Sequence, residues 1–188
     1  MLPTSRSFTT TAVGGLLNVL KSQCGISQAF DPTAGGALPP VVQFDAIWDT
    51  GATNSAITQA VVDACGLVPT SMAQVHGVHG VSTAEVYLVN IYLPNNVAFA
   101  GVHVTKGANL PGAQILIGMD VISQGDFAVT NLGGITKFSF RVPSEAHIDF
   151  VEEHNARILK ERFKHGGSGK HRPKKHKTFG ENKKRRRK

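Results

Sequence analysis

The sequence predicts a mainly β fold: a small closed barrel with one or two short helices, followed by a C-terminal helix and a disordered basic tail. Short stretches rich in Val, Ile, Tyr and Phe recur between residues 41 and 142, separated by Gly, Pro and Asn turns, a pattern typical of small β barrels. Apolar residues at helical spacing are confined to a few segments. The charge is divided: residues 165–188 carry 11 Lys and Arg against one acid, whereas residues 1–164 carry 9 against 12 acids.

The first 26 residues are interpreted as a lead-in to the folded body. Residues 1–28 contain no Asp or Glu and many Ser and Thr, a bias shared with targeting segments. Two glycines and an asparagine interrupt the apolar stretch 12–20, however, and basic residues are few. We therefore expect residues 1–26 to form a poorly ordered lead-in rather than a targeting signal.

The folded body is expected over residues 27–143. Residues 41–48 are β-rich and predict its first strand. A short helix is predicted over residues 59–65, because apolar residues recur at helical spacing between Thr58, a suitable N-cap, and Gly66, a suitable stop. The remaining predicted elements are a hairpin of 85–93 with 97–104, a strand at 115–117, one or two helical turns within 119–124, and a hairpin of 127–130 with 135–142.

The composition changes after Pro143. Residues 144–164 are charged and carry a partial apolar stripe, which predicts a helix. The like-charged residues 165–188 begin with a Gly-rich joint and are expected to be disordered. Because Lys and Arg runs bind phosphate backbones without sequence selectivity, we favour nonspecific nucleic-acid binding by this tail over a merely solubilising role.

The composition also excludes several classes of protein. Two isolated cysteines, Cys24 and Cys65, exclude a disulfide-rich scaffold and a zinc ribbon. They fit a reducing compartment such as the cytoplasm, although a single bridge between them stays open. No apolar run approaches the roughly 18–20 residues of a membrane-spanning helix, so no membrane partner is expected.

The informative motif is Asp49-Thr50-Gly51, which directly follows the strand predicted at 41–48. Gly51 permits a tight turn, Thr50 can hydrogen-bond across a close backbone contact, and the arrangement would aim the Asp49 side chain out of the strand end. The tripeptide alone also reads as an ordinary turn, because all three residues favour turns. Trp48 is expected to pack in the core, with shielding of Asp49 from water as the alternative.

Two further features make this motif specific. A Gly-punctuated hairpin candidate follows it at 75–81, and the apolar residues 115–117 end in Gly118. This ordered set resembles the retropepsin-like aspartic protease family over residues 41–142. It looks closer to bacterial retropepsin-like and DNA-damage-inducible-type domains than to the retroviral enzymes. The resemblance implies a closed acid-protease barrel and an aspartic-type endopeptidase.

The resemblance also implies roles for individual residues. Asp49 would be the catalytic aspartate, Thr50 would form interlocking hydrogen bonds between subunits, and Gly51 would complete the active-site loop. Retroviral enzymes carry an Arg where this chain has Met119, so their dimer geometry is not assumed. Substrate would bind at a flap tip and at an apolar-Gly element that packs on the catalytic loop, formed by Gly77, Val78, His79, Gly80, Ile117 and Gly118.

Aspartic protease chemistry sets a further requirement. Two carboxylates must lie about 3 Å apart and share one proton, but the chain contains one Asp-Thr-Gly. The implied enzyme is therefore a homodimer in which two copies of Asp49 meet at a two-fold axis. Its substrate would be an extended polypeptide with apolar side chains at the cleaved bond. The mechanism requires no metal and no cofactor.

Several alternatives were weighed against this interpretation. His76, His79 and His103 could suggest a metal site, but no Cys or acid stands near them at ligand spacing, so exposed loop histidines are favoured. Asp120 and Asp126 are assigned to helix-start or turn roles. The alternative function is a non-catalytic retropepsin-fold module for binding or dimerisation that contacts nucleic acid through its tail. The intact Asp-Thr-Gly favours the enzyme, because a binding module does not need that acid.

Overall fold

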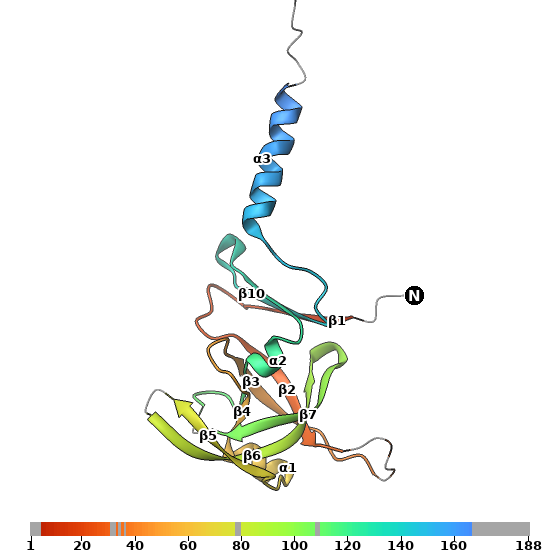
Figure 1. Cartoon of the computed structure of the whole chain (residues 1–188), viewed down its shortest axis with the longest axis vertical. Helices are drawn as coiled ribbons and strands as arrows, with labels where there is room; N and C mark the ends of the chain where they lie inside the picture. The colour runs from red at the N-terminus through yellow and green to blue at the C-terminus, as the bar shows by residue number, and fades with distance from the viewer. Residues whose placement is uncertain are drawn as a thin grey trace, which may run out of the picture. The chain divides into compact units, whose positions relative to one another are not determined.

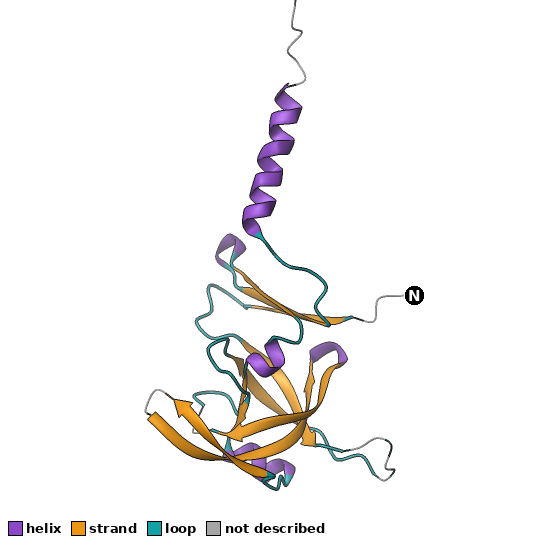
Figure 2. Cartoon of the chain, viewed as in Figure 1, coloured by secondary structure: helices purple, strands orange, loops and turns teal. Residues whose placement is uncertain are grey.

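The computed structural model describes residues 5–30, 33, 35, 37–77, 80–107 and 110–166. The chain divides into two compact units, Met1–His147 and Ile148–Lys188 (Figure 1). The first unit holds the strands and two short α-helices, and the second holds the helix α3. The mainly β fold predicted from the sequence is confirmed (Figure 2).

A closed six-stranded barrel forms the centre of the first unit. Its strands are hydrogen-bonded in the order β2-β3-β8-β4-β7-β6, and pairing of β2 with β6 closes the circle. The barrel strands are β2 (Lys21–Gln28), β3 (Val42–Trp48), β4 (Ala56–Ile57), β6 (Gly80–Leu93), β7 (Val97–Lys106) and β8 (Ile115–Ile117). The strand β5 (Ser71–Gly77) extends the sheet outward as a hairpin with β6.

The hairpins predicted from local turn signals are confirmed. β6 and β7 pair around the 3₁₀ turn η1 (Pro94–Asn96), with Leu93 opposite Val97. Asn95 and Asn96 adopt positive φ angles there, which asparagine tolerates better than most residues. β9 (Asp126–Thr130) and β10 (Lys137–Val142) pair around the second 3₁₀ turn η2 (Leu132–Gly134).

The structure differs from the prediction of a poorly ordered lead-in over residues 1–26. β1 (Arg6–Thr11) pairs with β10 in a three-stranded sheet of order β1-β10-β9, and residues 21–26 belong to the barrel strand β2. Phe8, Cys24 and Ile26 are buried. Polar residues and one glycine occupy the remaining positions of both strands, so their apolar alternation is weak in the sequence.

An aromatic cluster joins the three-stranded sheet to the barrel. Trp48 at the end of β3 stacks on Phe127 of β9, with ring centroids 5.4 Å apart. It also contacts Phe8, Phe138 and Phe140, and its indole N–H donates to the Ser22 hydroxyl. Trp48 is therefore a core residue, as expected, and it anchors the strand that leads into Asp49.

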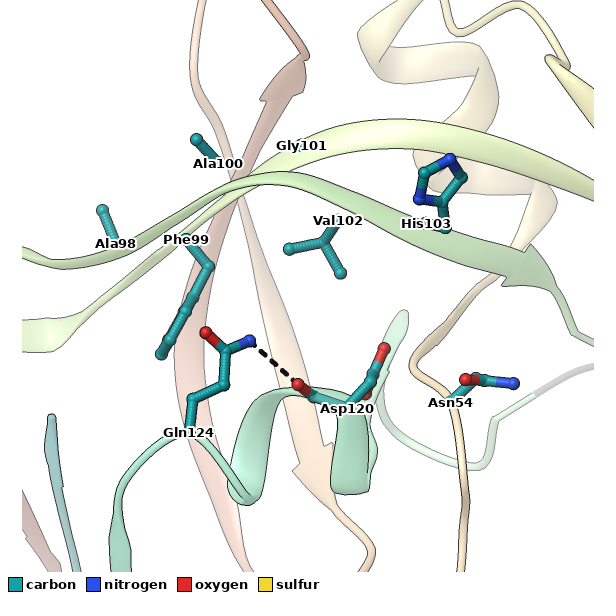
Figure 3. Close-up of a pocket in the computed structure, with 9 residues that line it drawn as sticks. All are labelled: Asn54, Ala98, Phe99, Ala100, Gly101, Val102, His103, Asp120 and Gln124. Atoms are coloured by element: carbon teal, nitrogen blue, oxygen red, sulfur yellow. Dashed lines mark hydrogen bonds between the residues drawn. The ribbon is translucent and has the colours of Figure 1, made fainter. Parts of the chain in front are cut away.

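The two short helices of the first unit also match the sequence prediction. α1 (Gln59–Cys65) ends at Gly66, which adopts the left-handed conformation at φ 58°. Thr58 occupies the N-cap position, but its buried side-chain hydroxyl has no hydrogen-bond partner among the described residues. α2 (Met119–Ile122) follows Gly118 directly and faces β7 across a small pocket (Figure 3).

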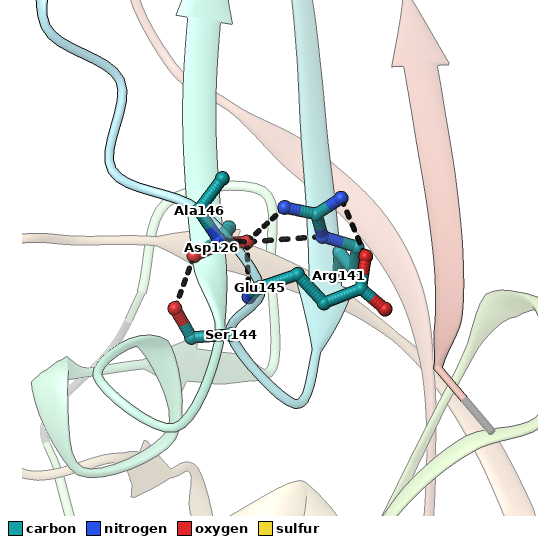
Figure 4. Close-up of polar contacts among 5 residues, drawn as sticks. All are labelled: Asp126, Arg141, Ser144, Glu145 and Ala146. Carbon is teal, nitrogen blue, oxygen red and sulfur yellow. Dashed lines mark hydrogen bonds and ion pairs between the residues drawn. The ribbon is translucent and has the colours of Figure 1, made fainter. Parts of the chain in front are cut away.

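The helix predicted at 144–164 begins later than expected. Asp126 accepts hydrogen bonds from the Ser144 hydroxyl and from the backbone N–H groups of Glu145 and Ala146 (Figure 4). These contacts hold the segment after β10 in a non-helical conformation. In the second unit, α3 (Phe150–Gly166) is capped by Asp149, whose Oδ1 accepts from the N–H groups of Val151 and Glu152.

Both cysteines are free thiols in the interior of the first unit. Burial raises the pKa of Cys24 to about 12 and also raises the pKa of Cys65. Within the part of the chain that the structure describes, no helix is long and apolar enough to cross a membrane. The basic residues 167–188 lie outside the described residues, so disorder and nucleic-acid binding of the tail stay predictions.

Candidate active site

The Asp-Thr-Gly loop leaves the barrel where two parallel strands end. β3 and β8 pair in parallel, with Trp48 beside Ile117. The backbone N–H of the next residue, Asp49, donates to the Ile117 carbonyl over 3.0 Å. Both strands end in buried residues, since Trp48 and Ile117 belong to the core. The first residue of the loop is therefore held in place by the buried ends of these two strands.

A second set of contacts joins the far side of this loop to the start of α2. The N–H of Met119 donates to the Ala52 carbonyl over 2.8 Å, and the N–H of Asp120 donates to the Thr53 carbonyl over 3.1 Å. Gly118 lies against the loop, where a Cβ atom would stand 2.6 Å from the carbonyl carbon of Asn54. Only glycine fits at that distance, which explains why the apolar run of β8 ends in glycine.

Ser55, which is buried, and Asp120, which is half-buried, form a polar link beneath the loop. The Asp120 carboxylate accepts from the Ser55 hydroxyl over 2.8 Å, from the Ser55 N–H over 3.0 Å, and from the Val121 N–H. The same hydroxyl accepts from the Gly118 N–H over 3.0 Å. Asp120 thus has the helix-start role expected from the sequence. Its link to Ser55 was not predicted, because the two residues are 65 positions apart.

The Asp49 side chain is half-buried, and its carboxylate accepts few hydrogen bonds. Its Oδ1 accepts one hydrogen bond, from the Gly51 N–H over 2.8 Å. Gly51 and Ala52 turn the chain back, since the Ala52 N–H donates to the Asp49 carbonyl. Thr50 at the tip of the loop is exposed, and its hydroxyl has no hydrogen-bond partner among the described residues.

A groove of about 680 Å³ opens beside this loop. Residues 51–54 of the loop form one wall, and residues 73–76, 80–82 and 84 of the β5–β6 hairpin contribute the other. The lining is completed by Ala56, Thr105, Lys106, Gly107 and Leu116. A groove between a loop and a hairpin can accept an extended chain, with strand-type hydrogen bonds to the hairpin backbone.

The residues predicted to bind substrate fall into three groups. Gly77 and Gly80 stand opposite each other at the ends of β5 and β6, and Val78 and His79 lie outside the described residues. Ile117 and Gly118 are fully covered and do not line the groove. They support the loop from behind, and the neighbouring Leu116 faces the groove. Contact of Ile117 and Gly118 with substrate stays a prediction.

A second, smaller pocket lies on the other side of Asn54. Asp120 and Gln124 of the α2 region border it from one side, and residues 98–103 of β7 border it from the other (Figure 3). The Gln124 amide donates to the backbone carbonyl of Asp120. Asn54 lines both cavities, so this pocket adjoins the groove. Asp49 is among the lining residues of neither cavity; the groove reaches the next residues of its loop, from Gly51 onward.

Charged groups flank the base of the β5–β6 hairpin. Lys106, which lines the groove, forms an ion pair with Glu85. The Tyr87 hydroxyl donates to the same carboxylate over 2.9 Å. These two partners lower the pKa of Glu85, while burial and the neighbouring carboxylate raise the pKa of Tyr87 to about 12.

The histidines considered as metal ligands do not converge among the described residues. His76 lines the groove, whereas His103 lines the second pocket. Within the described ranges, no group of three or more His, Cys, Asp or Glu side chains is placed to hold a metal ion.

Comparisons with known proteins bear on the family. The fold is similar to a crystal structure of a retropepsin-like aspartic protease from Rickettsia conorii, with TM-score 0.45 and 12% identity over 76% of this chain and 98% of that chain. It is also similar to the solution structure of the simian foamy virus (mac) protease, with TM-score 0.36 and 17% identity over 55% of this chain and 92% of that chain. No curated protein sequence matches the chain.

A family model described as "gag-polyprotein putative aspartyl protease" matches residues 41–124. That range contains β3, the Asp-Thr-Gly loop, the β5–β6 hairpin and the β8–α2 junction, which are the elements that build the groove and its floor. Over these residues the chain matches the gag-polyprotein aspartyl protease family, which supports the retropepsin-like family expected from the sequence.

Proposed function

We propose that this protein is an aspartic endopeptidase that acts as a homodimer. Each copy contributes one Asp49, and the two carboxylates lie about 3 Å apart at the two-fold axis and share a proton. Like charges so close cannot both ionise, so one carboxyl stays protonated while the other is charged. A single copy of the described site holds half of the required pair.

The chemistry follows from this shared proton. The ionised Asp49 takes a proton from a water molecule held between the two carboxyl groups, and the water attacks the scissile carbonyl carbon. The protonated Asp49 donates its proton to the carbonyl oxygen as the tetrahedral intermediate forms. The Asp49 that took the proton from water then donates it to the amide nitrogen, the C–N bond breaks, and the intermediate returns a hydroxyl proton to the other Asp49. The role of Thr50 in this proposal is to bond across the axis, which suits its exposed, unpaired hydroxyl.

The observation that carries the proposal is the state of Asp49. Its carboxylate is half-buried at a fixed strand end, accepts only one hydrogen bond among the described residues, and belongs to the loop that walls the groove. Backbone hydrogen bonds hold both sides of the loop, to β8 on one side and to the start of α2 on the other, and the Ser55–Asp120 link lies beneath it. A carboxylate that only stabilised a turn would not require this support. This arrangement supports chemistry at the loop more than it supports a passive binding surface.

The lining of the groove indicates the class of substrate. Val75, Val81, Ala84 and Leu116 are apolar, and Lys106 is the one cation among the described lining residues. We expect an extended polypeptide with apolar side chains next to the cleaved bond, because burial of such side chains in the groove is favourable.

The test is cleavage of a broad peptide library by the full-length protein and by its Asp49→Asn variant. Asparagine keeps the shape of the side chain and can still accept from the Gly51 N–H, but it cannot exchange the proton. We expect kcat/KM to fall by about 100- to 10,000-fold, the range for loss of a general acid or base. Pepstatin should inhibit the parent protein.

A matched control is Asp45→Asn, which removes an exposed carboxylate from the same strand β3. This variant should cleave like the parent. The proposal is contradicted if the parent cleaves no peptide in the library, or if Asp49→Asn retains parental cleavage.

A further inference from the structure

The charges along the groove are unevenly placed. Among the described residues that line it, Lys106 is the one Lys or Arg, and none is Asp or Glu. Lys106 is the last residue of β7 and pairs with Ile57 of β4. Its neighbours in the lining, Ala56 and Gly107, have no polar side chain. An acidic side chain that entered this part of the groove would therefore meet an ammonium group and no lining carboxylate.

The Lys106 ammonium has a partner but keeps hydrogen-bonding capacity. It forms an ion pair with Glu85, which is its one ionic partner among the described residues. A lysine ammonium carries three N–H donors, and the Lys106 side chain is 33% exposed. Glu85 itself is not a lining residue. The cation of this pair therefore faces the groove and keeps donors for a ligand there.

Glu85 fixes the position of the ammonium. Its carboxylate also accepts from the Tyr87 hydroxyl over 2.9 Å. Hydrogen bonds from Lys106 and Tyr87 lower the pKa of Glu85, so its carboxylate stays charged near neutral pH and the ion pair stays formed. A side chain that is already held loses less rotamer freedom when a ligand binds. Ion pairs as exposed as this one contribute little to stability, so stability alone gives no strong reason for a cation in the groove.

We propose that Lys106 makes the groove selective for polypeptides that carry Asp or Glu at a position apart from the cleaved bond. This inference rests on the proposed function, because it describes the substrate that is cleaved at Asp49. The acidic side chain would accept a charge-assisted hydrogen bond from the ammonium. It would not stand next to the cleaved bond, because the negative charge shared by the two Asp49 carboxyl groups would repel it there. Lys106 would repel a Lys or Arg at the selected position.

The test uses pairs of peptides with amidated C-termini that differ only in having Glu or Gln at one position. A sequence that the parent cleaves supplies the frame, and the exchange is made at each position in turn. With the parent protein we expect kcat/KM for the Glu peptide to exceed that for the Gln peptide by about tenfold at one position. Lys106→Met keeps the length of the side chain and removes its charge, so the preference for Glu should disappear. The comparison is made within each variant, so a partly unfolded sample does not distort it.

Glu85→Gln is a second variant that separates selectivity from structure. It removes the carboxylate that competes with the substrate for the ammonium, so the preference for Glu should rise above the parental value. Lys106→Met and Glu85→Gln break the same ion pair, and a purely structural pair would not give opposite changes. Lys137→Met is the matched control, because it removes an exposed lysine of β10 that does not line the groove. It should keep the parental preference.

The inference is overturned if no position shows a preference for Glu, or if the preference persists in Lys106→Met and therefore has another source. Cleavage that is lost in Asp49→Asn would leave the protease assignment standing in either case.

Peptide binding gives the converse result. Fluorescence anisotropy of labelled Glu and Gln peptides is measured on Asp49→Asn and on the double variant Asp49→Asn/Lys106→Met. Suppose that the Glu peptide binds more tightly only when Lys106 is present, whereas cleavage is absent from the parent or does not depend on Asp49. The selectivity of the groove then stands and the protease assignment fails. Equal binding of the two peptides by Asp49→Asn would overturn the selectivity.

Discussion

The Asp-Thr-Gly loop contains Asp49 and the strand β9 begins with Asp126, and these two carboxylates are used in opposite ways. Asp126 accepts from the Arg141 guanidinium, from the Ser144 hydroxyl, and from the N–H groups of Glu145 and Ala146 (Figure 4). Asp49 accepts from the Gly51 N–H alone within the described residues. Because a carboxylate offers about four acceptor positions, Asp126 is saturated and Asp49 is not.

This difference separates a structural carboxylate from a candidate catalytic one. Backbone, hydroxyl and guanidinium donors hold the pKa of Asp126 far below its usual range, so it stays ionised and does not exchange a proton near neutral pH. Asp120, with three donors from Ser55 and Val121, also serves the fold. Among the described residues, Asp49 keeps free acceptor capacity for a donor such as water, although the backbone around it is held by hydrogen bonds.

The largest effect is expected where the rigid backbone of the Asp-Thr-Gly loop is broken. In Gly118→Ala the new Cβ would lie 2.6 Å from the carbonyl carbon and 2.7 Å from the carbonyl oxygen of Asn54. Backbone atoms cannot give way as a flexible side chain does. We therefore expect the free energy of unfolding, measured by urea titration, to fall by about 3 kcal/mol, the upper end for overpacking.

The control for this substitution is Gly14→Ala, because nothing lies within 4 Å of the Cβ position at Gly14. It should unfold at the same urea concentration as the parent. A Gly118→Ala protein of parental stability would show that the loop is not fixed against α2. Asp49 could then not be described as a lightly hydrogen-bonded carboxylate on a firmly held backbone, in contrast to Asp126.

A smaller effect is expected from Ser55→Ala, which removes the link between Asp120 and the loop. The alanine leaves the buried Gly118 N–H without its acceptor and deprives Asp120 of one donor. Leaving a buried donor unsatisfied costs about 1–3 kcal/mol of unfolding free energy. Amide hydrogen exchange at Gly118 should also accelerate.

The exposed Ser123 provides the comparison, since its hydroxyl donates to the Met119 carbonyl at the surface of α2. Ser123→Ala should change the unfolding free energy by no more than about 0.5 kcal/mol. Equal effects of the two substitutions would argue against a special role for the buried link.

The elements that the sequence predicted are those with local signals. β3, β8 and the hairpin of β6 with β7 carry β-branched residues bounded by turn residues, and α1 ends at a glycine in the left-handed conformation. The Asp49-Thr50-Gly51 motif could also be recognised from adjacent residues alone. By contrast, β1 and β2 look polar until their pairing with β10 and β3 shows which of their side chains face the core.

The features that the sequence did not reveal all depend on contacts between distant residues. Ser55 meets Asp120 across 65 positions, and Ser144 meets Asp126 across 18. The second contact stops the C-terminal helix from starting where its composition predicted, because N–H groups of that segment are already bound to a carboxylate. Asp149 followed by Glu152 and Glu153 was an available signal for the true helix start.

The saturated carboxylate should give a pH-dependent contribution to stability. Because folding lowers the pKa of Asp126, its carboxylate stabilises the fold above the unfolded pKa of about 4 and loses this contribution as the pH falls below that value. Asp126→Asn should therefore lower Tm relative to the parent by a constant amount between about pH 5 and 7, and the difference should shrink below about pH 4.

Asp63→Asn on the exposed side of α1 serves as the control for pH effects of a lost carboxylate, since within the described residues the Asp63 carboxylate accepts only from the Gln59 side chain. It should show little change in Tm at any of these pH values. A difference in Tm between parent and Asp126→Asn that does not change with pH would mean that the shape of the Asp126 side chain, rather than its charge, holds the segment after β10.

The smallest effect on stability is expected at the residue with the largest expected effect on cleavage. Asp49→Asn keeps an acceptor for the Gly51 N–H and removes a charge that no described residue pairs with. The unfolding free energy at pH 7, measured at equal protein concentration, should stay within about 0.5 kcal/mol of the parent value. A large loss of stability would mean that the Asp49 charge holds the loop together, as the Asp126 charge holds the segment after β10. Unchanged stability together with lost cleavage would instead establish that this carboxylate serves chemistry rather than the fold.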